Sequence, residues 1–475
     1  MLFCSQAYLV FFLCVFTVYW AIPWHRARVW LLLAASFYFY ASFNHWLAVL
    51  IGVSTVADYW LARGIDASNS SRARKALLLT SLAGNLGLLC YFKYVNFFLG
   101  SLESALHALG AAHSIPLLSV ILPIGISFYT FEAINYMVDV HRRKIPAERS
   151  LANFMLFITF FPHLVAGPIV RARDFLPQAG RPKRWDWARI NLGVQLLVMG
   201  LFKKLAIADR MACFVDPIYE HPESYGTYSL WLAVFAYALQ IYGDFSGYTD
   251  MAIGSAHLLG YKLAQNFNMP YLARNIADFW RRWHISLSSW LRDYLFIPLG
   301  GSRGSRWQTC WNLLLTMTLG GLWHGAAWHF VIWGLIQGVW LSLHRLFVDF
   351  VKPRPRLDRN LQSHLGTVVC VLGTFALVSL TWVVFRASSL ADAGLILRNL
   401  FVPVQGTLRP PVHGVGLLYA YIVVAICHAI AMQPRFGRLA IRLPAPITGI
   451  SYATAATLAL ILAPASGKMF IYFQF

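Results

Sequence analysis

Long stretches without a charged residue are the feature that most limits how this chain can fold. Each is close to or above the ~20 apolar residues that a helix needs to cross a bilayer. The candidate stretches are 1–25, 29–57, 76–92, 104–131, 150–170, 224–243, 307–344, 360–385, 410–434 and 443–467. They predict an all-α polytopic integral membrane protein.

The composition agrees with a membrane protein and excludes several other classes. Of the 475 residues, 58% are hydrophobic and 12% are charged, whereas a soluble domain is about 25% charged. The net charge of +20 would suggest nucleic-acid binding in a soluble protein. Here the Lys and Arg residues lie between apolar stretches, as in the cytoplasmic loops of membrane proteins. A soluble enzyme, a disordered tail and a nucleic-acid-binding protein are therefore disfavoured.

Three stretches need more than one helix or a broken one. Stretch 29–57 is expected to break near Asn44–His45, and stretch 307–344 near Gly325. Stretch 150–170 contains Pro162 and Gly167–Pro168 between basic flanks, which suggests a re-entrant or broken segment covered by protein. Together the stretches predict about 11 to 13 transmembrane or re-entrant helices.

The loop charges predict the orientation. Loops 25–28, 63–75, 141–144 and 171–189 are basic, whereas 209–223 is acidic. The positive-inside rule places the basic loops in the cytoplasm and the N-terminus outside. Because 1–25 lacks a basic start and a small-residue cleavage site, we expect a retained span. We expect a single membrane-embedded domain over 1–475, with N-terminal helices (1–150), a catalytic core (151–350) and C-terminal helices (351–475).

Metal, disulfide and nucleotide chemistry have no motif in the sequence. The seven cysteines are scattered and form no CxxC pair, which favours small buried apolar side chains. There is no HExxH, Walker loop, GxGxxG after a strand or GxSxG elbow. We therefore expect no metal site and no bound cofactor.

The first polar cluster lies at 240–250, where an apolar span is expected to end. It holds Asp244, Ser246, Tyr248 and Asp250. Ionisable groups within a membrane are costly and are candidates for function. The cluster is either the polar wall of a buried site, or a helix end where the carboxylates cap amides or pair with arginines.

The second cluster lies at 278–294. Apolar residues recur there at helical spacing between arginines, which predicts an amphipathic helix. Trp and Arg side chains would anchor such a helix at the lipid headgroups. That interpretation leaves His284, in the middle of the segment, unexplained.

The third cluster, 320–329, places His324 within an uncharged stretch and between small residues. Small neighbours would leave room for a substrate, and an imidazole can remove a proton from a hydroxyl near neutral pH. The alternative is a hydrogen-bonded packing residue. His329, five residues on, would point to another helix face.

An ordered set of motifs resembles the membrane-bound O-acyltransferase family. The resemblance is to the bacterial branch that contains the alginate O-acetyltransferase membrane subunit and the teichoic acid D-alanyl transfer protein. The motifs are Phe92–Phe97, Leu164–Ile169, Phe202–Asp209, Asp244–Gly254, Asp278–Leu287, Trp290–Gly301 and Gly321–Gly325, and the chain ends in Phe470–Phe475. The resemblance covers essentially the whole chain.

The resemblance implies a helical ring around a central funnel, with His324 as the catalytic histidine and His284 as a second functional histidine. The expected pocket or substrate-binding residues are Asp244, Ser246, Tyr248, Asp250, Trp283, Ser286, Arg292, Asn312 and Trp323. Two positions depart from the pattern, namely Gly243, where an aromatic is frequent, and His163, where Gln is usual. These departures affect the identity of the acceptor more than the chemistry.

The expected activity is transfer of an acyl group, most simply acetyl, in a bacterial inner membrane. The donor would be a cytoplasmic thioester, either acetyl-coenzyme A or an acyl carrier. Basic residues between 262 and 306 would attract it, or would only set the topology. The acceptor would be a hydroxyl of a cell-envelope polysaccharide such as alginate, or a periplasmic partner enzyme. The alternatives are D-alanyl transfer to teichoic acid and a non-catalytic transporter or flippase.

Overall fold

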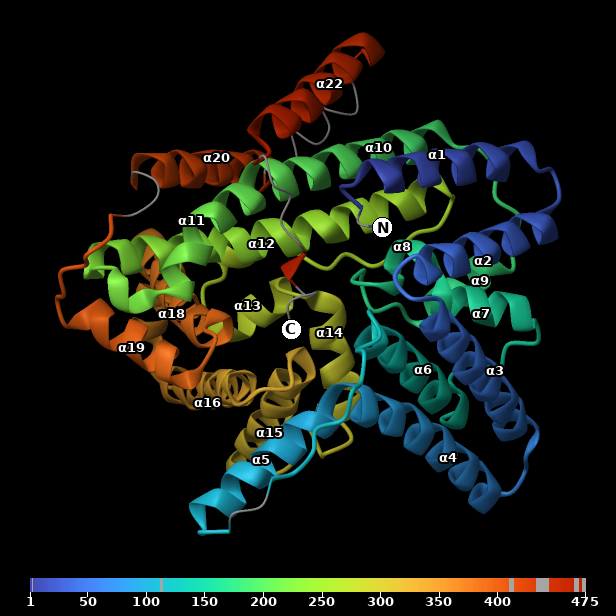
Figure 1. The fold of residues 1–475 in the computed structure, drawn as a ribbon, viewed down its shortest axis with the longest axis horizontal. Coiled ribbons are helices and arrows are strands. Elements are labelled where there is room, and N and C mark those ends of the chain that lie inside the picture. Colours follow the sequence, from blue (N-terminus) through green and yellow to red (C-terminus); the bar gives the residue numbers. More distant parts are fainter. Residues whose placement is uncertain (2, 112–113, 410–413, 433–443, 465–469, 472–475) are drawn as a thin grey trace. The chain divides into compact units, whose positions relative to one another are not determined.

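The computed structural model describes residues 1, 3–111, 114–409, 414–432, 444–464 and 470–471 (Figure 1). Within these residues the regular structure is helical, apart from an isolated bridge between Tyr225 and Leu408. The all-α prediction is therefore confirmed. Residues 472–475 of the terminal motif lie outside the described residues.

Six helical segments are long and apolar enough to cross a bilayer. They are His45–Ala67, Ser71–Ala108, Trp187–Glu220, Trp328–Val351, His364–Arg386 and Ala445–Leu462. Shorter apolar helices cover Gln6–Ala21, Leu151–Leu164 and Gly416–His428. These segments give several passes through the membrane.

The chain divides into two compact units, each described separately below. The first contains Met1–Val194 and Ala252–Ala264, and the second contains Gln195–Met251 and Gln265–Phe475. Helices α10 (Trp187–Phe202) and α12 (Thr227–Leu258) have residues in both units.

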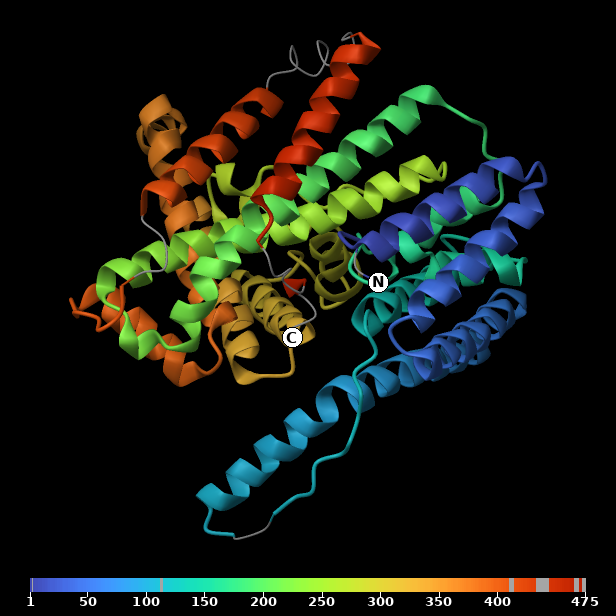
Figure 2. The ribbon, with the colours of Figure 1, turned by 45° about the horizontal axis from the view of Figure 1, so that its top comes forward.

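The first unit contains the helices from α1 to α9. These are α1 (Gln6–Ala21), α2 (His25–Ala41), α3 (His45–Ala67), α4 (Ser71–Leu89), α5 (Val95–Ala108), α6 (Ile126–His141), α7 (Leu151–Thr159), α8 (Phe161–Leu164) and α9 (Ala172–Ala179). A π-helical turn, Cys90–Tyr94, joins α4 to α5, so that they form one long helical segment (Figure 2). Helix α6 packs against α3 and α4 and is buried along almost its whole length.

Local sequence explains most breaks in this unit. The break expected in 29–57 is confirmed, because Asn44 ends the turn after α2 and its Oδ1 accepts hydrogen bonds from the amides of Trp46 and Leu47. Stretch 150–170 is also broken, between α7 and α8, where Pro162 follows.

The prediction of one span over 104–131 is wrong. Helix α5 ends at Ala108, and α6 begins only at Ile126. Pro116 and Pro123 lack the amide that a continuing helix needs. Gly125 has φ +77°, and a Cβ there would lie 2.6 Å from the carbonyl oxygen of Leu164, so the turn into α6 requires glycine.

The second unit holds the other helices and the polar segments. These helices are α11 (Asp209–Glu220), α13 (Ile276–Arg282), α14 (Ile285–Leu291), α15 (Arg306–His324), α16 (Trp328–Val351), α17 (Pro355–Gln362), α18 (His364–Arg386), α19 (Leu390–Phe401), α20 (Gly414–Met432) and α22 (Ala445–Leu462). Helices α15 and α16 form a tightly packed hairpin, which confirms the break expected at Gly325. A Cβ on Gly321 would lie 2.9 Å from the Cα of Gly334, so glycines permit the close approach.

Candidate active site

Two histidines meet in the interior of the second unit. His284 lies between α13 and α14, and His324 is the last residue of α15. Their exposed fractions are 0% and 5%. The ring centroids are 6.5 Å apart, and the Trp323 ring lies 6.1 Å from that of His284. The two residues that the resemblance implies to be functional therefore lie close together in the interior of the second unit.

The backbone at His284 corrects the prediction of a continuous amphipathic helix over 278–294. Helix α13 ends at Arg282, and His284 has φ +43° and ψ +54°, in the left-handed region. A residue with a Cβ is strained in this region. Such strain persists where surrounding contacts hold it and is frequent at functional sites. The break between α13 and α14 places His284, which is fully buried, at the junction of the two helices.

Asn266 holds this histidine in position. Its Oδ1 accepts a hydrogen bond from the backbone amide of Ser286 at 3.1 Å and from the Ser286 hydroxyl at 2.9 Å. Because a backbone N–H only donates, this amide atom is the oxygen. His284 Nδ1, 3.1 Å from the same oxygen, must therefore carry the proton. In the neutral ring, Nε2 is then the basic nitrogen.

Aromatic rings surround His324. Its ring lies 5.3 Å from Trp333 and 5.4 Å from Phe385, both nearly edge-on. The small residues beside it serve close packing, since a Cβ on Gly325 would collide with the Phe330 ring. The space expected beside Gly321 and Gly325 is thus occupied by α16, and these glycines fix the end of α15.

The cluster at 240–250 does not end its helix, as the sequence suggested, but lies inside α12. Asp244 is buried and forms an ion pair with Lys204, in which the Lys204 Nζ lies 2.8 Å from the Asp244 Oδ1. Lys204 also pairs with Asp209 at 2.7 Å. The other oxygen of Asp244 accepts the backbone amide of Ile471 at 2.7 Å. Asp244 therefore pairs with a basic side chain, as one of the two interpretations of this cluster expects, but that side chain is a lysine and not an arginine.

The rest of this cluster also makes contacts within the second unit. Asp250 pairs with Lys203 at 2.6 Å. The Tyr248 ring stacks on Phe470 with centroids 4.3 Å apart, and Ser246 is buried. Gly243, one of the two departures, lies against the carbonyl of Lys203, where a Cβ would be 3.2 Å from the oxygen. A side chain at this position would therefore require the backbone around Lys203 to shift by a few tenths of an ångström.

The remaining expected pocket residues divide between the interior and the surface. Trp283 is buried and stacks on Phe279 with centroids 5.6 Å apart. Asn312 is buried and donates to the carbonyl of Gly301 at 3.0 Å. Arg292, by contrast, has a side chain 62% exposed and pairs with Asp293 at 2.8 Å. It is not brought to the buried histidines.

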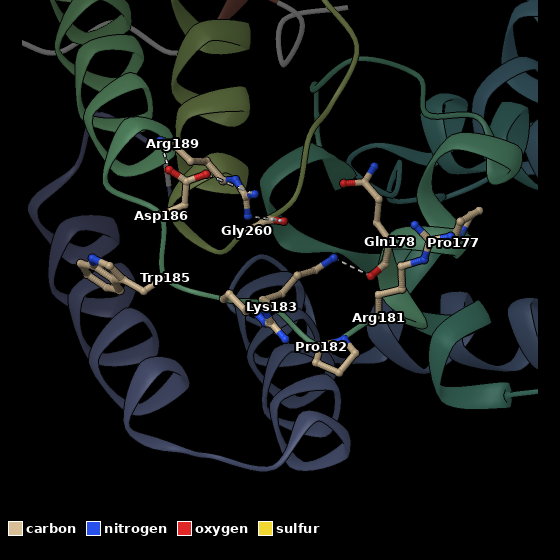
Figure 3. Close-up of a pocket in the computed structure, with 10 residues that line it drawn as sticks. Pro177, Gln178, Arg181, Pro182, Lys183, Trp185, Asp186, Arg189 and Gly260 are labelled. Carbon is tan, nitrogen blue, oxygen red and sulfur yellow. Dashed lines mark hydrogen bonds and ion pairs between the residues drawn. The ribbon is translucent and has the colours of Figure 1, made fainter.

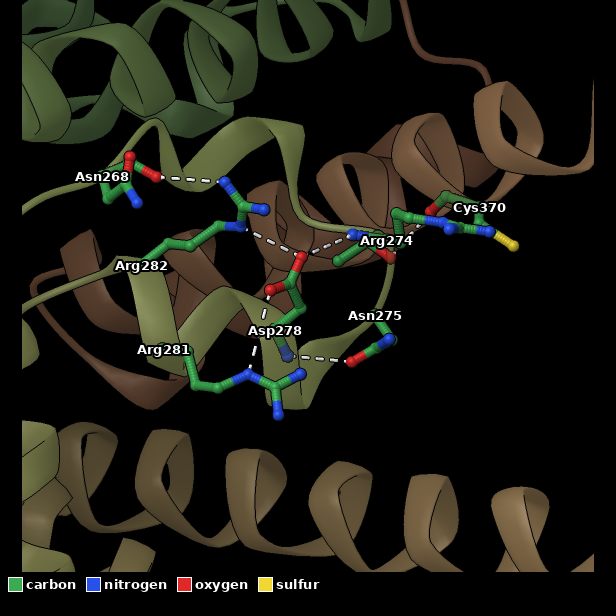
Figure 4. A network of polar contacts seen from close by, with 8 residues as sticks. Asn268, Arg274, Asn275, Asp278, Arg281, Arg282 and Cys370 are labelled. Carbon is green, nitrogen blue, oxygen red and sulfur yellow. Dashed lines mark hydrogen bonds and ion pairs between the residues drawn. The ribbon is translucent and has the colours of Figure 1, made fainter. Parts of the chain in front are cut away.

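A basic cluster surrounds Asp278 at the surface of the second unit (Figure 4). The Asp278 carboxylate lies 3.0 Å from Arg282 Nε and 3.9 Å from Arg281 Nε. It also accepts the backbone amide of Arg274 at 3.3 Å. One carboxylate therefore organises three arginines from the 262–306 segment.

His163, the second departure, lies in the first unit. Its Nδ1 is 3.2 Å from a carboxylate oxygen of Glu132, and both side chains are buried. The same oxygen accepts the amide of Val170 at 2.8 Å. His163 thus ties the broken segment after α7 to α6.

Sequence reasoning missed Asn266, Lys203 and Lys204 as parts of these sites. The two lysines lie in a π-helical turn, Lys203–Ala208, within a segment long and apolar enough to cross the bilayer. Such charges in a span are a signal that partners are near. Asn266 stands in an irregular polar segment, and nothing local marks it.

Comparison with known proteins gives a consistent result. Residues 3–384 match the sequence model of the membrane-bound O-acyltransferase family. The chain is 41% identical over 404 residues to the Pseudomonas aeruginosa protein named "Probable alginate O-acetylase AlgI", which covers 84% of this chain and 75% of that one. It is 37% identical over 400 residues to the Helicobacter pylori peptidoglycan O-acetyltransferase (78% and 73%). It is 29% identical over 281 residues to the Bacillus subtilis teichoic acid D-alanyltransferase (55% and 68%).

Proposed function

The chain belongs to the membrane-bound O-acyltransferase family, and from this membership we propose that it acetylates a hydroxyl group of a cell-envelope polysaccharide. It is a multi-pass membrane acyltransferase. The two relatives with the higher identities are named as O-acetylating enzymes of alginate and peptidoglycan, which supports acetyl as the acyl group. Because the members of this family are acyltransferases, membership favours this function over a transporter or flippase.

The observation that carries the proposal is the buried pair His284 and His324, 6.5 Å apart between ring centroids. Acyl transfer needs a base beside the attacking hydroxyl. In our scheme His324 takes the hydroxyl proton while the oxygen attacks the thioester carbonyl. The new C–O bond forms, the C–S bond breaks, and the proton passes to the leaving thiolate. His284, with Nε2 unprotonated, is the second polar group beside the reacting atoms.

For the donor, we propose acetyl-coenzyme A or an acyl carrier thioester in the cytoplasm. Both carry negative charge. The arginines around Asp278 support this, because exposed cations concentrate an anionic substrate at their surface. The side chain of Arg281 is 72% exposed. In this scheme the membrane is the bacterial inner membrane, the N-terminus is periplasmic, and a periplasmic partner enzyme or the glycan itself receives the acetyl group.

The experiment is release of free coenzyme A from acetyl-coenzyme A by the purified protein in detergent, with and without periplasmic extract. His324→Ala should abolish release, whereas His329→Ala, a change of the same type at the second residue of α16, should not. Equal release by wild type and His324→Ala would refute the assignment of His324. Absence of release by the wild type, with extract present, would refute acetyl-coenzyme A as the donor.

D-alanyl transfer is the second candidate, favoured by the similarity to teichoic acid D-alanyltransferases. The same preparation would be given a D-alanyl carrier thioester and teichoic acid. Turnover of that donor, together with failure to use an acetyl thioester, would replace the acetyl proposal.

A further inference from the structure

A second polar feature is a pocket of about 620 Å³ in the first unit (Figure 3). It lies between the end of α9 and the start of α10, with Gly260 at its edge. Its charged lining residues are Arg181, Lys183, Arg184, Arg189 and a single carboxylate, Asp186. We call this set the basic pocket.

The loop that forms the basic pocket contacts two other segments, around Arg28 and around Gly260–Lys262. Arg28 donates to the carbonyl of Lys183 at 2.9 Å and to that of Ile22 at 2.7 Å. Gln178 exchanges hydrogen bonds with the backbone of Lys262, at 2.8 and 3.0 Å. Gly260 has φ +84°, and a Cβ there would lie 3.1 Å from Lys183 Cγ. The pocket is therefore built before any ligand arrives.

The positive charge of the basic pocket is poorly compensated by the protein. Asp186 lies 3.7 Å from Arg189, and it also accepts the amides of Ala188 and Arg189 at the start of α10. The guanidinium groups of Arg181 and Arg184 make no hydrogen bond or ion pair with any residue that the structure describes. One carboxylate thus faces four cationic side chains.

Lys183 is a half-buried cation of the basic pocket. Its Nζ donates to the carbonyl of Gln178 and lies 4.3 Å from the centroid of the Tyr261 ring. Burial, followed by repulsion from Arg189 and Arg181, lowers the pKa of Lys183 to about 8. An anion in the pocket would remove part of that repulsion.

Tryptophans stand beside the basic pocket. The Trp185 ring packs edge-on against Trp20, with centroids 5.0 Å apart, and against Trp187 at 5.1 Å. Trp187 is 73% exposed. Tryptophan and basic side chains concentrate at the headgroup level of a bilayer, and basic pockets there bind anionic lipid headgroups. Arginine is also suited to phosphate, because its planar group can donate two hydrogen bonds at once.

We propose that the basic pocket binds a phosphate group, presented by an anionic phospholipid at the membrane surface. The residues that line the basic pocket all belong to the first unit, whereas the two histidines belong to the second. Phosphate binding there does not depend on the proposed acetyl transfer.

The test measures ligand binding by the full chain in detergent, by native mass spectrometry and by titration. The probes are phosphatidylglycerol, zwitterionic phosphatidylcholine and inorganic pyrophosphate. The variant is Arg181→Glu/Arg184→Glu. The matched control, Arg72→Glu/Lys75→Glu, makes the same change of charge on exposed residues of α4.

We expect wild type and control to bind phosphatidylglycerol alike and above phosphatidylcholine. The pocket variant should bind phosphatidylglycerol at least about tenfold more weakly, because each basic residue near the membrane surface strengthens the attraction to anionic lipid. If the wild type binds pyrophosphate more tightly than the lipid, and the pocket variant loses this binding, the pocket is a phosphate site for a soluble ligand and not for a lipid. Equal binding of both probes by pocket variant and wild type, or an equal loss in the control, would overturn the proposal. A size-exclusion profile checks that each variant is folded.

Discussion

The side-chain oxygen of Asn266 lies 3.1 Å from Nδ1 of His284 and fixes which ring nitrogen carries the proton. The backbone amide of Ser286 donates to the same oxygen, so the amide of Asn266 cannot be reversed without losing that bond. A residue 18 positions earlier in the chain thus sets the tautomer of a histidine in the candidate active site. Outer contacts of this kind orient functional histidines in many sites.

Asn266→Asp should move the pH dependence of acetyl transfer. The substitution keeps the acceptor oxygen but adds a negative charge beside His284, which favours the protonated imidazole. The acidic limb of the pH–rate profile should therefore shift to higher pH. The measurement is transfer rate against pH for purified protein.

Asn268→Asp is the matched control, because Asn268 is exposed and lies two residues from Asn266. Its profile should coincide with that of the wild type. If Asn266→Asp and wild type also coincide, Asn266 does not act through His284.

His284→Gly should separate stability from activity. Glycine adopts the left-handed conformation without the strain, about 1–2 kcal/mol, that a Cβ brings, and this gain offsets part of the packing lost with the ring. We therefore expect His284→Gly to unfold at a higher temperature than His284→Ala, although both lose acetyl transfer. The measurements are thermal unfolding in detergent and coenzyme A release.

Arg143→Gly is the control for the backbone effect. Arg143 is exposed and also has a positive φ, of +56°, so glycine there should stabilise the protein and leave activity intact. A higher unfolding temperature for His284→Ala than for His284→Gly would contradict the claim that the left-handed backbone is strained.

The sequence predicts those breaks whose cause is local. Asn44 is a strong N-cap, and Gly325 stands between two apolar helices, so both breaks are visible in the sequence. The break at His284 is different, because the apolar spacing of an amphipathic helix continues through it. Its contact with Asn266 comes from another segment, and the helical period contains no trace of it.

The same distinction applies to the polar residues. The charge of Asp244 inside an apolar segment marks it as unusual, but its partner Lys204 lies 40 residues away on another helix. Sequence spacing on one helix cannot place such a pair. The resemblance brought His284 and His324 forward together, whereas the residues alone gave two separate candidates. Arg292 stays a predicted pocket residue; its side chain is 62% exposed and pairs with Asp293, and nothing in the motif tells which side of the π-helical turn Arg292–Phe296 it occupies.

Gly321→Ala should destabilise the α15–α16 hairpin that positions His324. The added methyl group would lie within 2.9 Å of the Gly334 Cα, and forcing extra volume into a packed contact typically costs about 1–3 kcal/mol. We expect a lower unfolding temperature and reduced transfer. Gly373→Ala, on α18, is the control because a Cβ there meets nothing within 4 Å. Equal unfolding temperatures for the two variants would contradict the packing argument.

Lys204→Met should be the most destabilising of these changes. Lys204 is buried between Asp209 and Asp244, at 2.7 and 2.8 Å, and removing it leaves two carboxylates without their shared cation. Breaking a buried ion pair on one side typically costs about 3–5 kcal/mol.

Adding Asp244→Asn to Lys204→Met should recover part of the loss, because one of the uncompensated charges is then gone. Lys203→Met should lose less, since Lys203 pairs with one carboxylate, Asp250, and the two side chains are 22% and 19% exposed, so the pair is less deeply buried than that of Lys204. The measurement is the unfolding temperature of the three variants in detergent. If Lys203→Met unfolds at a lower temperature than Lys204→Met, the Lys204 ion pairs do not hold this part of the second unit together.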